Sequence, residues 1–556
     1  MNRKTNLMIG LLCATALTMC YSTYAKKSTH EASTEVKRNN KTKPAICNSR
    51  LTDFAIFGSG LYSTDIFHRQ LDEFIGQCID KTLNEKIVRK INNFYQKNGY
   101  IYSFVSDIKR VGTKLHITVL EGHIKEVAYE ESFESPQLKE YAKKLTEIKP
   151  FNKNIASRYM ALIRRLPGMV DKVKFTPLVI PFDQVDPKNP ATVDLVIENY
   201  FYRVSGFINY DNRYKDLRSD ALVPTGADSI YTRHKGQNFT TLSANINNPF
   251  SLGGQINTAV ITSLSHEDNN FFIAYKQPIN SHGTTALMSA SSRLIKFPIK
   301  QETKSIEAGF LHPLFLNLSQ SLDLTIKANQ YSTRNQYKLK SDSFDSFRVK
   351  KLIFGAAYSL KDKFSGRHHY SINYHKSIHI NQEKLKSSSH DQSFNKYLAD
   401  ANIAYPFFCT NCTFTFNASG QYSKNNLFST EVFYPNLYNG SRGFDDSELY
   451  GDKGLSSSIE LSKYIPIEEH VTFQGFRIYT YFDRSKFWNN IDSSLKPKSA
   501  KIASYGLGTD IYVYSNLVFN LEYSKPISKS VQSNLFKSDK KPGSRIYFGI
   551  RYDFGF

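Results

Sequence analysis

The sequence lacks the long apolar runs that helical membrane proteins need. After residue 25, no stretch of the 556 residues approaches the roughly 18 apolar residues of a spanning helix. It also lacks a phosphate-binding loop and the Gly-x-Ser-x-Gly motif of many hydrolases. These absences argue against a helical membrane protein, an ATP-driven pump and an enzyme, and we expect no cofactor and no metal.

Cysteine is scarce, and two of the six cysteines lie in the first 25 residues. There, two basic residues precede a short apolar run that ends in small residues. This pattern predicts a secretory signal peptide, residues 1–25. A lipoprotein signal processed at Cys20 is the alternative, which the bulky Met19 disfavours. Residues 26–46 then form a polar N-terminal segment.

Four cysteines remain beyond the signal peptide, namely Cys47, Cys78, Cys409 and Cys412. In an oxidising compartment, four cysteines predict two disulfides, with three alternative pairings. The segment "CTNC" is also compatible with half of a zinc site. No second Cys-x-x-Cys and no nearby pair of histidines accompanies it, so a disulfide is the favoured reading.

Acidic residues are fewer than basic ones. Lys and Arg number 72 against 50 Asp and Glu, which gives a formal net charge of +22. Such an excess is often a mark of nucleic-acid binding. For an exported protein we expect instead a basic periplasmic face or channel lining, and no nucleic-acid partner.

Aromatic residues are abundant, with 35 Tyr and 40 Phe against one Trp. The last segment, "RIYFGIRYDFGF" (residues 545–556), alternates strictly between two faces. One face is apolar: Ile546, Phe548, Ile550, Tyr552, Phe554, Phe556. The other carries Tyr547, Gly549, Arg551, Asp553 and Gly555. A chain that ends on such a strand resembles bacterial outer-membrane barrels, which are apolar toward lipid and polar toward the lumen.

The same alternation recurs upstream, for example in residues 505–514 and 517–524. Short turn signals separate the strands, at 247–250, 276–279, 311–314, 360–366, 405–412, 464–470 and 514–516. Longer polar stretches lie between them, at 211–236, 331–348, 381–395, 424–454, 483–500 and 527–544. Short turns on one side and long loops on the other are typical of a transmembrane barrel. The pattern predicts about 16 antiparallel strands in residues 201–556.

Three histidines, His369, His375 and His379, share one face of the strand predicted at residues 369–380. A strand rises about 3.3 Å per residue, so these side chains are too widely spaced for one metal ion. We therefore favour a polar lumen wall over a metal site.

Residues 47–200 follow a different pattern. Apolar residues recur at helical spacing in residues 82–98, and Gly99 stops this helix. Two strands follow, at 100–110 and 114–122. A second set repeats the order, with helices at 135–148 and 153–169 and strands at 171–180 and 192–201. Two small α+β domains are therefore predicted before the barrel.

Several motifs now resemble a known family in their order along the chain. "FYQKNGYIYSFVSDIKRVGTKLHITVLEGHIKEV" (residues 94–127) resembles the first POTRA domain of two-partner secretion transporters, the hemolysin activation/secretion proteins of Gram-negative bacteria. Its motif residues are Gly99, Tyr100 and Gly122. "LIRRLPGMVDKVKF" (residues 162–175) is similar to the second POTRA domain, and "YDNRYKD" to the entry into the barrel. The resemblance implies POTRA domains at 47–122 and 123–200.

The family carries a long loop with a Val-Arg-Gly-aromatic signature, and a later strand with a Phe-Asp pair. Here "SRGF" answers to the first, with Ser441 in place of valine before Arg442, Gly443 and Phe444. "YFDR" answers to the second. The resemblance implies that loop 424–454 folds into the lumen and that Arg442 pairs with Asp483, which alternation places on the lumen face. Glu460, also luminal, is the alternative partner.

The order of the elements in the resemblance also suggests which cysteines pair. Cys47 precedes the first strand and Cys78 follows the first helix of the first POTRA domain. Cys409 and Cys412 share one predicted periplasmic turn. We therefore expect the disulfides Cys47–Cys78 and Cys409–Cys412.

The resemblance implies a function without chemistry. An unfolded partner exoprotein, of the adhesin, hemolysin or contact-dependent toxin type, is captured by periplasmic POTRA domains and exported through the barrel. We expect a monomer surrounded by lipid of the outer membrane of a Gram-negative bacterium. The alternative is an assembly factor that inserts other β-barrels. A diffusion porin would not need the small domains.

Overall fold

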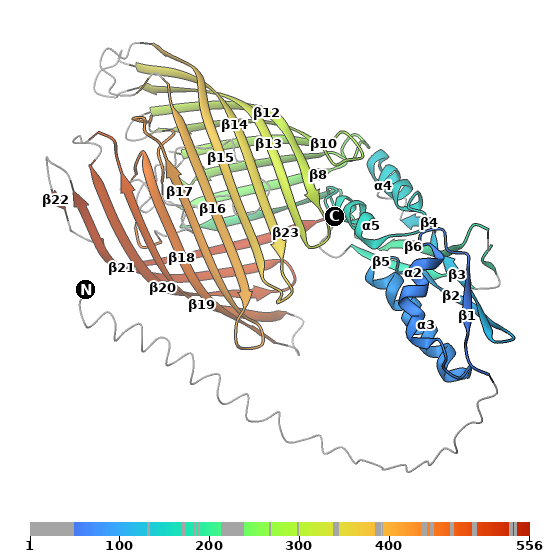
Figure 1. Cartoon of the computed structure of the whole chain (residues 1–556). Coiled ribbons are helices and arrows are strands. Elements are labelled where there is room, and N and C mark those ends of the chain that lie inside the picture. The colour runs from blue at the N-terminus through green and yellow to red at the C-terminus, as the bar shows by residue number, and fades with distance from the viewer. Residues whose placement is uncertain are drawn as a thin grey trace, which may run out of the picture.

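The computed structural model describes residues 49–129, 134–169, 173–181, 184–186, 188–198, 200–212, 238–265, 268–296, 300–336, 344–383, 391, 393–428, 430–434, 442–444, 450–467, 472–491, 497–532, 537–538 and 542–556. Two small α+β units, here called the first small unit (residues 49–121) and the second small unit (residues 123–198), lie at one end of a large β-barrel (Figure 1). None of the helices described combines the length and the apolar character needed to cross a bilayer.

The first small unit is a three-stranded sheet covered by helices. Its elements are β1 (Asp53–Phe57), α2 (Thr64–Leu71), the 3-10 helix η1 (Asp72–Phe74), α3 (Lys81–Lys97), β2 (Ser103–Val111) and β3 (Lys114–Glu121). The sheet order is β1-β3-β2, so β2 is an edge strand. The side chain of Asp80 caps the start of α3 by accepting from the N–H of Leu83 at 2.6 Å. At the other end, Gly99 has a φ of 93°, a conformation that glycine adopts at low cost.

The second small unit repeats this arrangement. Its elements are β4 (His123–Tyr129), α4 (Pro136–Thr146), α5 (Lys153–Arg164), β5 (Lys174–Val179) and β6 (Ala191–Glu198), and its sheet order is β4-β6-β5. The apolar faces of α4 and α5 pack on this sheet through Leu138, Leu145 and Ile163, none of which is exposed. The prediction of two small α+β units before the barrel is confirmed, whereas no residue range was predicted for the helix α2 of the first small unit.

The motif residues of the first small unit form its junction with the second. The backbone N–H of Lys153 donates to the carbonyl of Gly99 at 2.9 Å, and the N–H of Phe151 donates to the carbonyl of Gly122 at 2.9 Å. A side chain at Gly122 would collide with Thr192 and with the backbone of Tyr102. Glycine at position 122 therefore allows the two units to pack closely.

The barrel is one closed antiparallel sheet. It consists of 16 long strands and the short β22 (Lys537–Ser538). The long strands are β7 (Val204–Asp211), β8 (Phe239–Asn247), β9 (Gln255–Ser263), β10 (Asp268–Pro278), β11 (Thr285–Ile295), β12 (Lys300–Leu316), β13 (Gln320–Gln336), β14 (Phe344–Lys361), β15 (Arg367–Glu383), β16 (Asn395–Pro406), β17 (Cys412–Tyr422), β18 (Lys453–Pro466), β19 (Phe473–Trp488), β20 (Ser499–Val513), β21 (Leu517–Gln532) and β23 (Arg545–Gly555). The last strand pairs with the first, Gly549 opposite Asp211 and Gly555 opposite Ser205.

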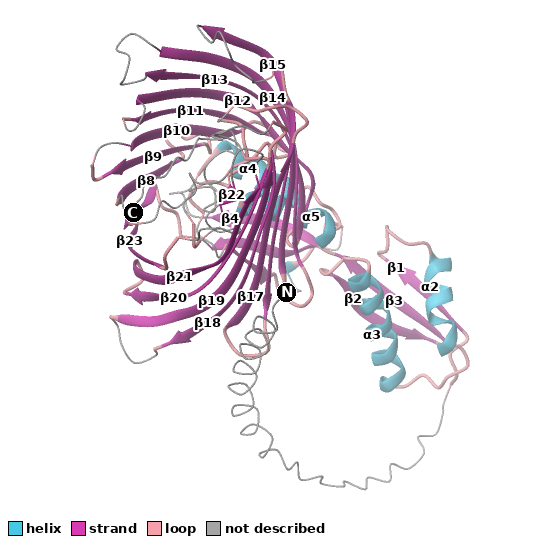
Figure 2. Ribbon diagram, turned by 90° about the vertical axis from the view of Figure 1, so that its left-hand side faces the viewer, coloured by secondary structure: helices cyan, strands magenta, loops and turns pink. Residues whose placement is uncertain are grey.

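The last strand shows how the wall is built. Ile546 and Phe548 are 65% and 40% exposed on the outer face, whereas Tyr547 between them is 5% exposed on the lumen side. This alternation confirms the predicted faces of residues 545–556. Figure 2 shows how the long strands wrap around the lumen, with the first small unit off to one side.

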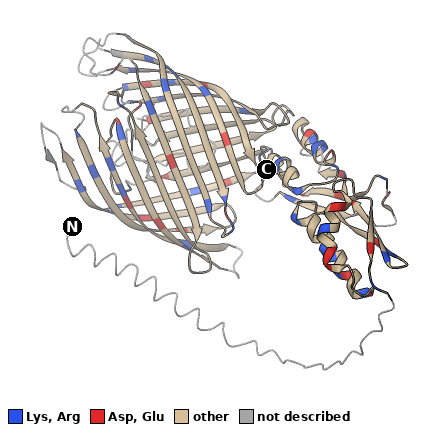
Figure 3. Cartoon of the chain, in the orientation of Figure 1, with Lys and Arg blue, Asp and Glu red and all other residues tan. Residues whose placement is uncertain are grey.

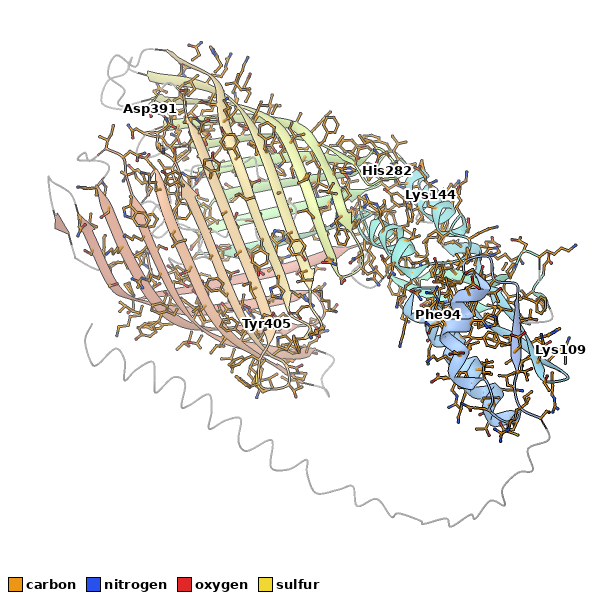
Figure 4. The ribbon with its side chains drawn as sticks, in the orientation of Figure 1. Phe94, Lys109, Lys144, His282, Asp391 and Tyr405 are labelled. Carbon is orange, nitrogen blue, oxygen red and sulfur yellow. A yellow bond between two sulfur atoms is a disulfide. The ribbon has the colours of Figure 1, made fainter. Side chains whose placement is uncertain are left out.

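The second small unit packs against the short turns of the barrel. The guanidinium of Arg165 donates to both carboxylate oxygens of Asp323, at 2.8 and 3.0 Å. Arg158 donates to the carbonyls of His282 and Pro313 at 2.8 and 3.0 Å. His282 is labelled at this junction in Figure 4. Because α5 and the following Arg165 contact the turn at His282 and the adjoining ends of β12 and β13, they hold the second small unit at this end of the barrel.

Two details of the barrel prediction are wrong. Residues 311–314 are not a turn, because β12 continues to Leu316 with a bulge between Pro313 and Phe315, and the turn follows at 317–319. A second bulge affects β15: His379 pairs with Lys350, while Ser377 pairs with Lys351. The bulge turns His379 to the outer face, so it does not share a face with His375.

Candidate functional site: the loop inside the barrel

The loop between β17 and β18 reaches into the barrel with Arg442, which is 3% exposed. Its Nε donates to Oδ2 of Asp483 at 3.0 Å, and its Nη2 donates to Oδ1 at 2.9 Å. The backbone N–H of Arg442 donates to Oδ2 as well, at 3.0 Å. Asp483 is fully buried. This two-pronged contact fixes both the position and the direction of the guanidinium.

Three further groups complete the surroundings of Arg442. Glu460 accepts from Nη1 at 2.9 Å, and the hydroxyl of Ser458 accepts from Nη2 at 2.7 Å. The ring of Tyr481 lies beneath the guanidinium, 3.2 Å from Cζ to the ring centroid. Strand register explains the convergence, because Ser458 pairs with Asp483 and Glu460 pairs with Tyr481 on β18 and β19. Both acidic residues named from the sequence therefore contact Arg442.

The aromatic wall beneath the arginine depends on two glycines and one carboxylate. The rings of Tyr479 and Tyr481 lie so close to Gly508 and Gly506 on β20 that any side chain there would collide with them. Both phenols donate to Glu522 on β21, at 2.9 Å each. Glu522 is 3% exposed, so its two hydrogen bonds anchor the rings in place.

A second arginine links this site to the rest of the lumen wall. Arg477 donates to Glu460 at 3.0 Å and to Asp510 at 2.8 Å. Glu460 thus bridges the two guanidinium groups of Arg442 and Arg477. The network is polar, buried and anchored on strands β18–β21, so it forms a preorganised receptor for one cation on the loop.

The residues that follow Arg442 add an apolar contact. The N–H of Gly443 donates to the hydroxyl of Ser504 at 3.2 Å, and a Cβ at position 443 would lie 2.7 Å from Cβ of Ser504. Glycine thus lets the backbone approach the wall. Phe444 is fully buried in a cluster of apolar side chains, namely Phe433, Phe487, Ala500, Ile502 and Val531. Ser441 lies outside the described residues.

The site is built for holding a loop rather than for chemistry. The N–H groups of the Arg442 guanidinium point at acceptors on the barrel wall. The backbone carbonyl of Arg442 accepts from the hydroxyl of Tyr547 at 2.8 Å. Among the described residues, no group of His, Cys, Asp and Glu has an arrangement that would hold a metal ion. This geometry holds Arg442 and the two residues after it against the lumen wall by charge and by shape.

A sequence comparison decides the family. The family of haemolysin secretion/activation proteins ShlB/FhaC/HecB matches residues 223–511, more than half of the chain. The chain belongs to this family. It is therefore a two-partner secretion transporter of the Gram-negative outer membrane, and these transporters are not enzymes. The family favours secretion over the assembly of other barrels.

Solved structures agree in fold with this secretion transporter. CdiB from Escherichia coli has a TM-score of 0.65 and 16% identity, over 95% of this chain and 93% of that chain. CdiB from Acinetobacter baumannii has a TM-score of 0.58 and 16% identity, over the full length of both chains. The two small units correspond to POTRA domains. No match was found among curated proteins.

The transporter holds the base of its loop by a second ion cluster, which the sequence analysis missed. Glu431 is 1% exposed and lies between Lys351 of β14, at 2.9 Å, and Lys396 of β16, at 2.8 Å. Both lysines are equally buried. Nearby, Leu427 and Phe428 pack against Phe347. The signal in the sequence is one acidic residue in the loop and lysines at lumen-facing strand positions.

Three of the four cysteines predicted to form disulfides lie within the described residues. Cys409 and Cys412 are joined in the turn between β16 and β17, with their Cα atoms 5.3 Å apart. Cys78 forms an isolated β-bridge with Arg50 in the first small unit. Cys47 lies outside the described residues, so the pairing Cys47–Cys78 stays a prediction.

Proposed function

We propose that the small units capture an unfolded partner exoprotein in the periplasm and that the barrel then exports it. The observation that carries this proposal is an open groove beside the edge strand β2. The groove has a volume of about 360 Å³ and is lined by one face of α3 and by residues 105–108. An extended peptide can add to such an edge by backbone hydrogen bonds, while side-chain pockets select its sequence.

The groove offers both parts of this recognition. β2 pairs with β3 on one side only, so its other edge has no neighbouring strand within the described first small unit. The apolar surface of Val88 and Val105 lies beside the charged Lys81, Glu85 and Arg89. A segment with alternating apolar and polar side chains fits this lining.

The proposal that the partner leaves through the barrel rests on two positions. The small units lie at one end of the barrel, and the loop that carries Arg442 lies inside it. The second small unit contacts the short turns, which face the periplasm in bacterial barrels. The orientation proposed therefore has both small units in the periplasm. Arg442 is held against the lumen wall, so it has to leave the wall when the partner passes. Folding of the partner outside the cell drives export without a nucleotide.

The proposed partner is a large secreted protein of the adhesin, hemolysin or contact-dependent toxin type. We propose that the transporter acts as a monomer, since among the described strands the barrel closes within one chain and offers a second copy no long unpaired edge. The partner can be identified as the protein that disappears from the culture medium when the transporter gene is deleted.

The substitution Val88→Lys tests capture. It introduces a long charged side chain into the groove without disturbing the buried face of α3, where Ile87 and Ile91 lie. We expect the partner to accumulate in the periplasm and to be degraded there, while the folded barrel stays in the outer membrane. Quantitative mass spectrometry of the medium measures the exported partner.

The matched control is Val111→Lys, which makes the same exchange at a 52% exposed valine near the end of β2, outside the groove. Secretion by this variant should equal that of the wild type. If Val88→Lys also secretes normally, the groove is not the capture site.

A further inference from the structure

The outer face of the barrel carries basic side chains at the end remote from the small units. Partners across a β-sheet point to the same side. Lys486 of β19 pairs with Lys501 of β20, and their neighbours Ser485 and Ile502, both 1% exposed, point inward. Both lysines therefore face outward. Figure 3 shows Lys and Arg on the strands toward this end of the barrel.

Two patches make up this basic surface. The first basic patch consists of Lys304, Arg348, Lys350 and Lys376 on β12, β14 and β15. The second basic patch consists of Lys453, Arg484, Lys486 and Lys501 on β18, β19 and β20. Strand register brings the members of the first patch together. Lys376 on β15 pairs with Leu352 on β14, and Lys350 lies two residues before Leu352 on the same face.

These patches have almost no acidic counterpart on the same face. Among the outward-facing side chains that the structure describes on β12–β21, Glu302 is the single carboxylate, and Lys304 contacts it at 2.7 Å. Lys486 and Lys501 stand directly opposite each other, an arrangement of like charges that destabilises a sheet unless an anion lies between them. The outer face thus has unbalanced positive charge at one level.

The level of the patches matches the edge of the lipid bilayer. Below Lys501 on β20, the outward residues Leu507 and Ile511 are apolar and exposed. Twelve residues of tilted strand separate Lys501 from Val513 at the short-turn end, which corresponds to a height of about 30 Å along the barrel axis. The apolar band of such barrels is roughly 25 Å tall, so Lys501 lies just above it. Lys486 lies over the ring of Trp488 at 4.1 Å, and such aromatic rings mark the membrane interface.

We propose that the two basic patches bind phosphate groups of the lipid in the outer leaflet of the outer membrane. A phosphorylated lipid presents acyl chains to the apolar band and phosphates at the height of the lysines. A protein ligand does not fit this surface, because this part of the wall faces lipid. The proposal rests on the orientation proposed above, with the small units in the periplasm.

Binding to purified full-length transporter in a non-ionic detergent tests the proposal. The probes are diphosphoryl lipid A and the same lipid with both phosphates removed. The variant R484Q/K486Q/K501Q removes three cations from the second basic patch, each worth about fivefold at an anionic membrane surface. We therefore expect roughly 100-fold weaker binding of the phosphorylated lipid at this patch, while the first basic patch still binds it. The phosphate-free lipid should bind weakly to every form of the protein.

The matched control is Lys463→Gln. Lys463 is an exposed lysine on the outer face of the same β18, near the opposite end, where it pairs with Ile478. This variant should bind as the wild type does. The variant R348Q/K350Q/K376Q tests the first basic patch independently. Folding of each variant is judged by heat-modifiable mobility in gels, and if R484Q/K486Q/K501Q does not fold, R348Q/K350Q/K376Q tests the proposal instead.

Two results would overturn the proposal: unchanged binding by a folded triple variant, or equal binding of the phosphate-free lipid. Binding in detergent does not depend on the orientation of the protein in the membrane. Labelling of Lys463→Cys and Lys501→Cys in intact cells tests that orientation separately. A wrong orientation is thereby distinguished from patches that bind no lipid.

Discussion

Arg442 brings a full positive charge into the barrel, which is favourable only when its donors are satisfied. Asp483, Glu460 and Ser458 accept from its guanidinium. Removing one partner from a buried ion pair typically costs 3–5 kcal/mol, because the other charge is left without compensation. The docked position of the loop therefore depends on single residues.

Arg442→Lys and Asp483→Asn should each lower secretion at least about tenfold, while folded barrel remains in the outer membrane. Lysine keeps the charge but has no planar fork to contact both oxygens of Asp483. Exported partner, measured against heat-modifiable barrel in membrane fractions, gives the result.

The control for these two variants is Glu307→Gln, which changes an equally buried carboxylate that pairs with Lys327 between two strands, at 3.1 Å. It alters an ion pair between two strands of the lumen wall, so secretion should be close to normal. Normal secretion by Arg442→Lys would mean that the loop contact has no role in transport.

A histidine in the second small unit predicts a response to pH. Burial, together with nearby Lys149, lowers the pKa of His123 below its ordinary value of 6.5. As the pH falls below 6.5, the unfolded chain binds more protons than the folded chain. The free energy of unfolding of the second small unit is therefore lower below this pH than above it. The protection factors of β4 and β6 amides in the full chain, which correct exchange rates for their intrinsic pH dependence, should be lower at pH 5 than at pH 7. His123→Gln should reduce this difference; an unchanged difference would assign it to other groups.

The family resemblance named Asp483 as the partner of Arg442, and alternation with Ile478 and Phe482 indicated that the side chain of Asp483 points into the lumen. Sequence alone could not find Glu431 between Lys351 and Lys396, since the path of a loop through the lumen has no periodic signal. His379 shows the limit of alternation itself, because a single bulge reverses the faces beyond it.

Among the elements, the loop between β17 and β18 is held at two places of opposite charge. Arg442 contacts acidic groups of β18 and β19, whereas Glu431 contacts lysines of β14 and β16. The two contacts lie on different parts of the wall. Releasing one frees its own part of the loop, while the other contact remains.

Glu431→Gln should loosen the base of the loop, because two buried lysines then lose their common counter-charge, at a cost of about 3–5 kcal/mol. Hydrogen exchange in residues 424–434 should become faster in the folded barrel. E431Q/K351M/K396M, which removes all three charges, should restore slow exchange.

K327M/E307Q, which removes a buried ion pair confined to strands, should leave exchange in the loop unchanged. Slow exchange in Glu431→Gln itself would show that the apolar contacts of Leu427 and Phe428 hold the loop base without the ion cluster.

For the whole molecule, the general architecture could be predicted because it follows from periods and order. Alternating strands, short turns and a terminal strand such as residues 545–556 lead to a closed barrel of 16 strands. The contact between Arg165 and Asp323 could not be predicted, since it joins surfaces of two units that are far apart in sequence. The same holds for the two basic patches, which assemble only when the barrel closes.

The most direct test of the account is a reversible lock between loop and wall, Gly443→Cys with Ser504→Cys. A Cβ at position 443 lies 2.7 Å from Cβ of Ser504, so a small shift reaches the separation of about 3.8 Å usual in disulfides. Secretion of the partner is measured with the lock oxidised and after mild reduction, beside the two single variants. The account predicts that the oxidised double variant does not secrete, that reduction restores export, and that the single variants do not respond to the redox change. Full secretion through a barrel whose lock is shown to be closed would contradict it.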